Sequence, residues 1–130
     1  MQKEIIQTDK AATTGAPLVQ AVKLGNLIFC SGASPRDPRQ GNKVVEGGFR
    51  AQATQAMENL RAVLEAGGSG FEHCLKATCY LMSFDENLPI LNEVWLQYFG
   101  RNVPARTALG VSKLRENYLL EIEVTAYVPQ

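Results

Sequence analysis

The chain has 130 residues, and we predict a single domain over residues 1–130. Thirteen basic residues balance thirteen acidic ones, and the absence of a basic cluster argues against nucleic-acid binding. Three cysteines without a CxxC pair, and apolar runs too short to span a bilayer, predict free thiols, a cytoplasmic location and no membrane partner.

The N-terminal part predicts three strands. Residues 3–8 form a candidate first strand. Residues 19–22 and 27–31 are predicted to form a hairpin that turns at residues 23–26, where a Gly-Asn pair tolerates positive φ. Residues 33–48 are rich in proline and glycine and contain a candidate brief edge strand at residues 43–45. A loop of this length inside a compact domain is often functional.

The middle of the chain predicts a helix and then a strand. Apolar residues recur at three- and four-residue steps from residue 49 to residue 66, which indicates one buried helical face. Gly67-Gly68 should end this helix as a left-handed cap. Residues 75–82 alternate between apolar and other side chains, so we expect a strand with Leu75 and Ala77 on one face.

The C-terminal part predicts a second helix and two more strands. Residues 83–86 introduce the helix, Asp85 is a plausible cap, and Gly100 should end it. Residues 106–111 and 119–128 are the expected strands. The whole order predicts an α+β fold, in which a single mixed β-sheet of about five to six strands carries two helices packed on one face.

Residues 27–30 are apolar at every position, which is typical of a strand that is covered on both faces. Two helices on one side of the sheet leave its other side open. We therefore predict that another copy of the chain covers that side, and that the protein is a homo-oligomer.

Two charged residues near the C-terminus are candidates for chemistry. Arg106 follows a rigid Pro104-Ala105 turn, which suits a guanidinium that receives a planar carboxylate through two hydrogen bonds. Glu121 lies in an alternating apolar run, so its side chain leaves the apolar face. Taken singly, residues of these types are ordinary surface charges in most proteins.

The segment from residue 104 to residue 122 resembles the signature of the reactive intermediate deaminase family (RidA/YjgF, enamine/imine deaminases). The family's N-terminal pattern is also present in residues 17–20, residues 24–28 and Ser31-Gly32. The resemblance covers nearly the whole chain. It implies a chorismate-mutase-like fold and a homotrimer whose sites lie in clefts between neighbouring subunits.

The resemblance also implies a hydrolase similar to 2-iminobutanoate/2-iminopropanoate deaminase, which acts in metabolite damage control. Such an enzyme converts reactive enamine or imine intermediates (2-aminoacrylate or related 2-imino acids) to 2-keto acids and ammonia. Arg106 matches the residue that binds the substrate carboxylate, and Glu121 matches the one that positions or activates water. Ser31 matches a position that contacts the substrate, and the backbone N–H of Gly32 could assist in binding the carboxylate. Asn92 matches a further polar position near the site, and an ordinary amide on the helix surface is an equally good interpretation of it. An imine is already electrophilic, so we expect no metal and no organic cofactor.

Two further substrate-binding positions depart from the family pattern. Ala108 stands where many members carry a cysteine, and its backbone carbonyl can still accept a hydrogen bond from the substrate amine. Leu18 stands where many carry a tyrosine. It removes a hydroxyl and makes one wall of the site apolar, which predicts imines with larger apolar side chains, such as those from leucine or methionine.

Three other functions are compatible with the same residues. One is a non-catalytic regulatory trimer that binds a small carboxylate, and another is a dedicated catabolic deaminase of an unsaturated amino-acid intermediate. The third is the ribonuclease or translation-inhibitor activity of some relatives, which the charge balance disfavours. Glu121 favours turnover over a pure carboxylate receptor, because an acid beside an anion site repels the ligand.

Overall fold

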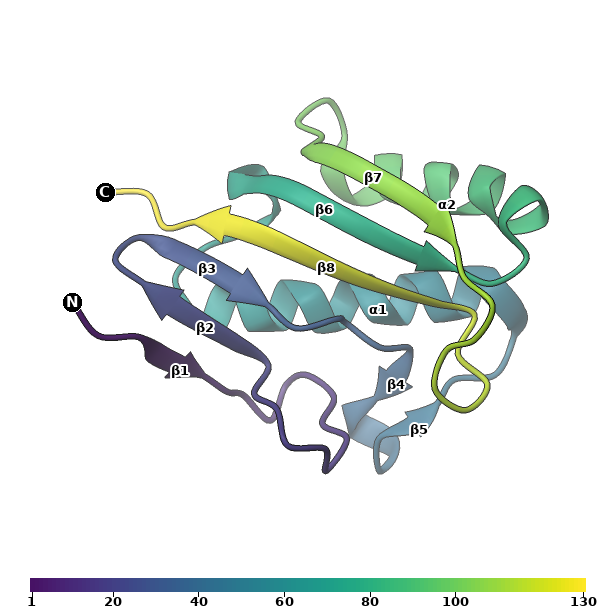
Figure 1. Ribbon diagram of the computed structural model, residues 1–130, viewed down its shortest axis with the longest axis horizontal. Helices are drawn as coiled ribbons and strands as arrows, with labels where there is room; N and C mark the ends of the chain where they lie inside the picture. The colour runs from purple at the N-terminus through teal and green to yellow at the C-terminus, as the bar shows by residue number, and fades with distance from the viewer.

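The computed structural model describes all 130 residues. The helices and strands follow one another in the order β1 (Glu4–Ile6), β2 (Ala21–Leu24), β3 (Leu27–Cys30), β4 (Arg36–Asp37), β5 (Lys43–Val44), α1 (Gly48–Ala66), β6 (Cys74–Leu81), α2 (Phe84–Phe99), β7 (Ala105–Gly110) and β8 (Leu120–Tyr127) (Figure 1). Two short 3-10 helices, Pro38–Gln40 and Phe71–His73, precede β5 and β6.

Six of the strands form one mixed sheet in the order β1-β2-β3-β8-β6-β7. β6 and β7 are parallel and are joined through α2, whereas the other neighbouring strands are antiparallel. Both helices lie behind the sheet in Figure 1, so they cover the same face. This confirms the predicted α+β fold with two helices on one face of a single mixed sheet.

Strand alternation divides the sheet into a helix side and an open side. Along β8, Leu120 and Ile122 are fully buried against the helices. Glu121 and Glu123, which alternate with them, face the open side. The apolar stripe of α1, which includes Met57, fills the space behind the sheet. The core therefore lies on one side of the sheet, as the apolar periodicity predicts.

Three local predictions were wrong in detail. β2 extends to Leu24, so the hairpin turns on Gly25-Asn26 alone, with Gly25 at φ +61°. Asp85 lies in the first turn of α2 and does not cap it, because Ser83 holds the N-cap position. Leu75 is 46% exposed, because a register irregularity between Cys74 and Lys76 turns it away from the core.

The predicted edge strand at residues 43–45 exists as β5, but it lies outside the main sheet. It pairs with β4 in a separate two-stranded sheet that contacts α1. In Figure 1 this small sheet lies beside the loop that connects β7 to β8. The stretch of residues 33–48 is therefore partly ordered by its own pairing.

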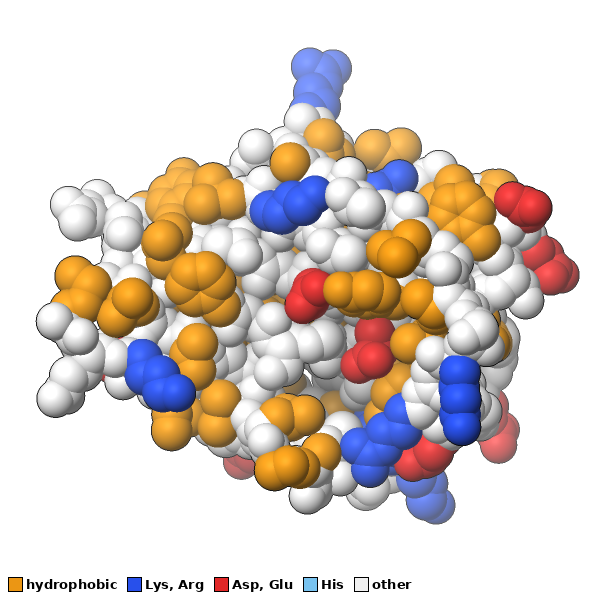
Figure 2. All heavy atoms as spheres, in the orientation of Figure 1, with side chains coloured by type: hydrophobic (Ala, Val, Ile, Leu, Met, Phe, Trp, Pro, Cys, Tyr) orange, Lys and Arg blue, Asp and Glu red, His pale blue; other side chains and the backbone are white.

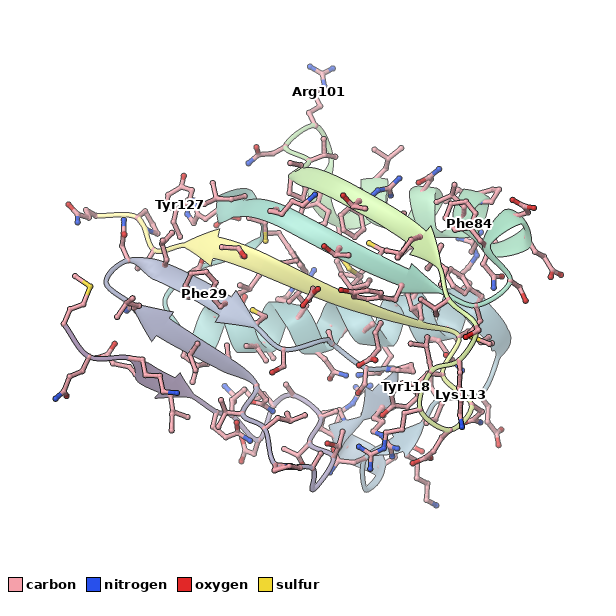
Figure 3. All side chains as sticks on the ribbon, viewed as in Figure 1. Phe29, Phe84, Arg101, Lys113, Tyr118 and Tyr127 are labelled. Atoms are coloured by element: carbon pink, nitrogen blue, oxygen red, sulfur yellow. The ribbon has the colours of Figure 1, made fainter.

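The open side carries apolar residues that nothing in the chain covers. Leu27 and Phe29 of β3 are exposed, whereas Ile28 and Cys30 between and beyond them are buried. Figure 2 shows hydrophobic side chains gathered at one end of this face, and Figure 3 shows Phe29 and Tyr127 at that end. The predicted homotrimer stays a prediction. Neither helix is long and apolar enough to cross a membrane.

Candidate active site

A cavity of about 490 Å³ opens beside Glu121 and reaches down to α1. Its walls come from the N-terminal segment of residues 7–20, from the residues after β3, and from the loop between β7 and β8. Figure 2 shows a hollow next to acidic side chains near the middle of the open side. Four of the predicted site residues line this cavity together: Leu18, Ser31, Gly32 and Glu121.

Gly32 meets Glu121 because the chain continues alongside β8 after β3 ends. The Ala33 backbone N–H donates to the Ile122 carbonyl at 2.6 Å, and the Ile122 N–H donates to the Ala33 carbonyl at 3.3 Å. A Cβ atom on Gly32 would lie 2.9 Å from Oε2 of Glu121. A side chain at position 32 would therefore require the carboxylate of Glu121 to move.

Ser31 ties the segment that carries Leu18 to the sheet. Its hydroxyl donates to the Val19 carbonyl at 2.7 Å, and its backbone N–H donates to the Gln20 carbonyl at 2.9 Å. The hydroxyl proton of Ser31 is therefore already used in a hydrogen bond. The lone pairs of its oxygen can still accept a hydrogen bond from a donor such as a substrate amine. Leu18 is 53% exposed at the cavity and supplies the apolar wall.

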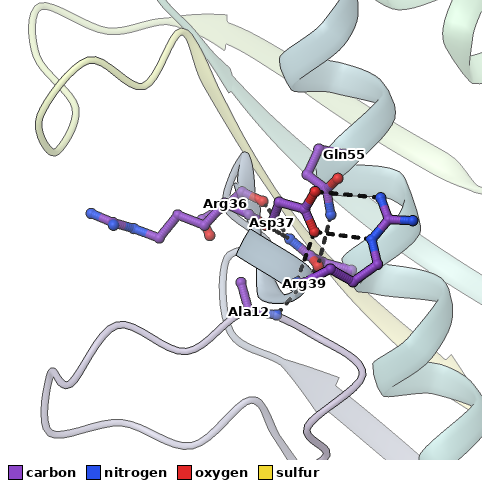
Figure 4. A network of polar contacts seen from close by, with 7 residues as sticks. Ala12, Arg36, Asp37, Arg39 and Gln55 are labelled. Carbon is purple, nitrogen blue, oxygen red and sulfur yellow. Dashed lines mark hydrogen bonds and ion pairs between the residues drawn. The ribbon is translucent and has the colours of Figure 1, made fainter. Parts of the chain in front are cut away.

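Two buried amides that sequence reasoning missed fix the cavity walls. Gln20 accepts from the Thr8 backbone N–H at 2.7 Å and donates to the Ala12 carbonyl at 3.0 Å. Asn59 of α1 accepts from the Ala12 N–H at 3.3 Å and donates to the Ser34 carbonyl at 2.9 Å. Figure 4 shows Ala12 within this polar network. An amide inside the apolar stripe of a helix, as at position 59, is the signal that could have revealed it.

The electrostatic environment of Glu121 suits proton exchange. Burial raises the pKa of Glu121 above its ordinary value, the carboxylate of Glu123 adds to the rise, and Arg115 opposes it. Glu123 itself accepts a hydrogen bond from the phenol of Tyr80. A carboxyl group poised in this way can take a proton from water and later return it.

Arg106 and Ala108 do not line the cavity. Arg106 pairs with Ala77 of β6, which is fully buried on the helix side. Glu121 pairs with Tyr80, whose side chain faces the open side. Within one chain, Arg106 and Glu121 therefore project from opposite sides of the sheet, on strands that β6 separates.

The guanidinium of Arg106 lies at the β7 edge of the sheet. Its central carbon is 5.3 Å from the ring centroid of Trp95 in α2, a distance at which the ring face attracts a cation. Asn92 is exposed on α2, one helical turn before Trp95. Arg106, Ala108 and Asn92 thus belong to the β7 and α2 end of the molecule, and Leu18, Ser31, Gly32 and Glu121 belong to the cavity.

No group of three or more His, Cys, Asp or Glu side chains is arranged to hold a metal ion. The three cysteines are free and buried, and burial raises the pKa of the Cys79 thiol to about 12.

Comparison with known proteins places these features in a family. The family model described as Endoribonuclease L-PSP matches residues 8–128. A RutC family protein of Pyrococcus horikoshii is 41% identical over 125 residues, which cover 96% of this chain and 98% of that protein. The human 2-iminobutanoate/2-iminopropanoate deaminase is 36% identical over 124 residues, which cover 95% of this chain and 89% of the human one.

Solved structures agree with this relationship. The crystal structure of RidA from the Antarctic bacterium Psychrobacter superposes with a TM-score of 0.91 at 36% identity, over 96% of this chain and 99% of that one. The matched residues include both the cavity and the β7 edge. The chain therefore belongs to the endoribonuclease L-PSP family, the YjgF/RidA family.

Proposed function

We propose that this protein is a hydrolytic deaminase of reactive enamine and imine intermediates, 2-aminoacrylate or related 2-imino acids, and that it acts in the cytoplasm. The observation that carries the proposal is the cavity in which Ser31 and Gly32 meet the partly buried carboxylate of Glu121. Membership of the family and the activity in the name of the human relative support it.

The reaction follows from the groups at the cavity. Glu121 takes a proton from water as the water oxygen bonds to the imine carbon and the C=N electron pair moves to nitrogen, and it then returns this proton to the nitrogen to give a carbinolamine. Glu121 next takes the proton of the carbinolamine hydroxyl and passes it to the nitrogen as the C=O bond forms and the C–N bond breaks, so that ammonia leaves. The Ser31 oxygen accepts a hydrogen bond from the nitrogen throughout. No step needs a cofactor, because the imine carbon is already electrophilic.

The substrate carboxylate requires a cation, and we assign this role to Arg106 of a neighbouring subunit. Arg106 faces the opposite side of the sheet from Glu121 in its own chain, so one chain alone does not complete the site. A homotrimer that covers the exposed Leu27 and Phe29 would bring the β7 edge of one subunit to the cavity of the next. Asn92 and the backbone carbonyl of Ala108 would arrive with Arg106 as further substrate contacts.

A coupled assay tests the proposal. A serine dehydratase acting on serine releases 2-aminoacrylate, and the protein should accelerate the formation of pyruvate. Arg106→Ala should abolish the acceleration, because the substrate loses both its anchor and its orientation. Glu121→Ala should lower turnover more than binding. Arg101→Ala is the matched control, since Arg101 is exposed and extends away from the molecule (Figure 3).

The same assay separates the alternatives. If Arg106→Ala leaves the acceleration intact, the assignment of the site is wrong. If the wild-type protein gives no acceleration with this or any other imine but binds small keto acids through Arg106, the protein is a carboxylate-binding regulator. Acceleration confined to a single unsaturated amino acid would identify a dedicated catabolic deaminase.

A further inference from the structure

We infer that Arg115 is a second anion-binding residue of the cavity, and that the preferred substrates are 2-imino acids whose side chain ends in a carboxylate. The inference rests on the proposed function and deepens it by naming the substrate class. Arg106 holds the carboxylate next to the imine carbon, and Arg115 holds the one at the far end of the substrate.

Arg115 is the positive charge of the cavity. Arg115 and Glu121 are the two charged residues among those that line it. Arg115 is close enough to Glu121 to oppose the rise of its pKa. A substrate whose far end carries an acid toward the rim of the cavity would therefore meet a cation from the same chain as Glu121.

The guanidinium of Arg115 has no hydrogen-bond partner in the chain. Its Nε forms only a long, exposed ion pair with Oε1 of Glu116 at 3.8 Å, which is beyond hydrogen-bond range. The same Glu116 oxygen is already bound by the guanidinium of Arg36. Since a guanidinium has five N–H donors in a planar fork, Arg115 can offer a ligand two parallel donors.

The loop that carries Arg115 is held in place from below. The buried side chain of Gln52 in α1, 4% exposed, donates to the Asn117 carbonyl at 3.1 Å and accepts from the Leu119 N–H at 2.7 Å. These two bonds fix the loop just beyond Arg115. A cation whose backbone is fixed in advance loses less entropy when it binds a ligand.

Arg36 also holds the loop that carries Arg115, through contacts with Glu116 and Tyr118. Its guanidinium bonds to the Tyr118 hydroxyl, to Glu116 and, at 2.9 Å, to the Asn42 carbonyl. Figure 4 shows Arg36 extending away from α1 and from the pair formed by Asp37 and Arg39. Glu116 has a φ of +48°, which a glutamate rarely adopts, so the contacts with Arg36 hold it in an unfavourable conformation.

The size of the cavity points to a substrate larger than 2-aminoacrylate. At about 30 Å³ per non-hydrogen atom, the volume of a water molecule in the liquid, the six atoms of 2-aminoacrylate fill less than half of the 490 Å³. A five-carbon 2-imino dicarboxylate, with ten such atoms, fits with room to spare. Its methylene stem can pack on Leu18, and its terminal carboxylate can reach Arg115.

This substrate class modifies the preference that Leu18 alone predicts. An imine with a purely apolar side chain, such as that from leucine, would gain the contact with Leu18. It would also lie against the half-exposed guanidinium of Arg115 without providing an anionic partner for it. A side chain that is apolar near the imine and acidic at its end satisfies both residues.

Calorimetric binding of stable keto acids to the full-length protein tests the inference. The ligands are 2-oxoglutarate, 2-oxobutanoate and 4-methyl-2-oxopentanoate, which represent an acidic, a short and an apolar side chain. The proteins are the wild type, Arg115→Gln, Arg115→Lys and Lys113→Gln. Lys113 is the matched control, because it is an exposed cation on the same loop that does not line the cavity (Figure 3).

We expect 2-oxoglutarate to bind the wild type and Lys113→Gln about tenfold or more tightly than the other two ligands. In Arg115→Gln this preference should disappear because 2-oxoglutarate loses much more affinity than 2-oxobutanoate does, and Arg115→Lys should restore part of it. The inference is overturned if the preference survives in Arg115→Gln, if Arg115→Gln weakens all three ligands equally, or if 4-methyl-2-oxopentanoate binds the wild type best.

Ammonia release from imines that an amino-acid oxidase generates separates this inference from the proposed function. If the wild type accelerates release from no imine, the deaminase proposal fails. If it accelerates release from the imines of glutamate and 2-aminobutyrate equally, and Arg115→Gln does the same, only the substrate class is wrong.

Discussion

The two sides of β8 differ in what surrounds them, although their residues alternate along one strand. Ile122 is fully buried against the helices, whereas its neighbour Glu121 lines the cavity on the open side. The helix side contributes to stability, and the open side carries the residues of the proposed reaction. Because side chains alternate with a period of two, substitutions one residue apart should affect different observables.

The largest effect is expected on the helix side, at Ile122. Ile122→Ala should lower the free energy of unfolding by about 2–5 kcal/mol, since it leaves a cavity in a close-packed core. Thr125→Ala, on the open side of the same strand, should cost less than about 1 kcal/mol. Urea denaturation at one fixed protein concentration measures both. Equal losses would show that the two sides do not differ as the burial indicates.

Gln52 lies on the helix side, but we expect it to affect ligand binding as well as stability. It lies on the buried face of α1, yet both its hydrogen bonds hold the loop at the rim of the cavity. Gln52→Ala should cost about 1–3 kcal/mol in unfolding free energy, because it leaves two backbone groups without partners. It should also weaken keto-acid binding, because the loop carries Arg115.

The control for this prediction is Thr54→Ala on the exposed face of α1, which should change neither quantity. Unfolding by urea and calorimetric binding of 2-oxoglutarate give the two measurements. A loss of stability without any loss of binding would mean that the position of Arg115 does not depend on Gln52.

Periodicity in the sequence predicted the helices, the strands of the sheet and the helix side of the core. It could not predict the irregularity that exposes Leu75, because a register is set by the partner strand and not by the strand itself. The order of the strands likewise depends on long-range pairing. The predicted turn at residues 23–26 contains the observed turn at Gly25-Asn26 but is too long, because its length depends on how far β2 stays paired with β3.

The candidate site was predictable where the family resemblance supplied a motif. It led to Leu18, Ser31, Gly32 and Glu121, which the fold brings into one cavity. It could not reveal Arg115, because a cation in an irregular loop has no periodicity to mark it. Nor could spacing along the chain show that Arg106 and Glu121 face opposite sides of the sheet, since this follows from their registers with β6.

An intermediate effect is expected at the contact between Gly32 and Glu121. Gly32→Ala places a methyl group 2.9 Å from the carboxylate oxygen, so Glu121 has to move. Displacement of a catalytic group by a fraction of an ångström to one ångström lowers the rate by about tenfold to a hundredfold. The coupled assay measures the loss as kcat, while binding of keto acids should change little.

Gly41→Ala is the control for this substitution. Gly41 has a φ of +66°, and an added Cβ there meets nothing within 4 Å, so the change should cost about 1 kcal/mol of stability through backbone strain alone. Its kcat should equal that of the wild type. If both variants lose activity to the same extent, general destabilisation explains the result and the contact at Gly32 does not.

The smallest effect is expected from Glu121 on stability, and its sign depends on pH. Burial, and then Glu123, raises the pKa of Glu121 in the folded chain, so the folded state binds this proton more tightly than the unfolded state does. The stability that the protonated carboxyl contributes is complete below the unfolded pKa. It is lost as the pH rises through the higher, folded pKa.

Glu121→Gln should therefore abolish turnover and yet stabilise the fold slightly near neutral pH, because glutamine never ionises. We expect a gain in unfolding free energy below about 1 kcal/mol at about pH 7, and no such gain at about pH 3.5, where Glu121 is protonated in both states. Urea denaturation at the two pH values measures the difference. A variant that is less stable than the wild type at about pH 7 would mean that the Glu121 carboxylate contributes to the fold as well as to the chemistry, and that the division between the two sides of β8 is incomplete.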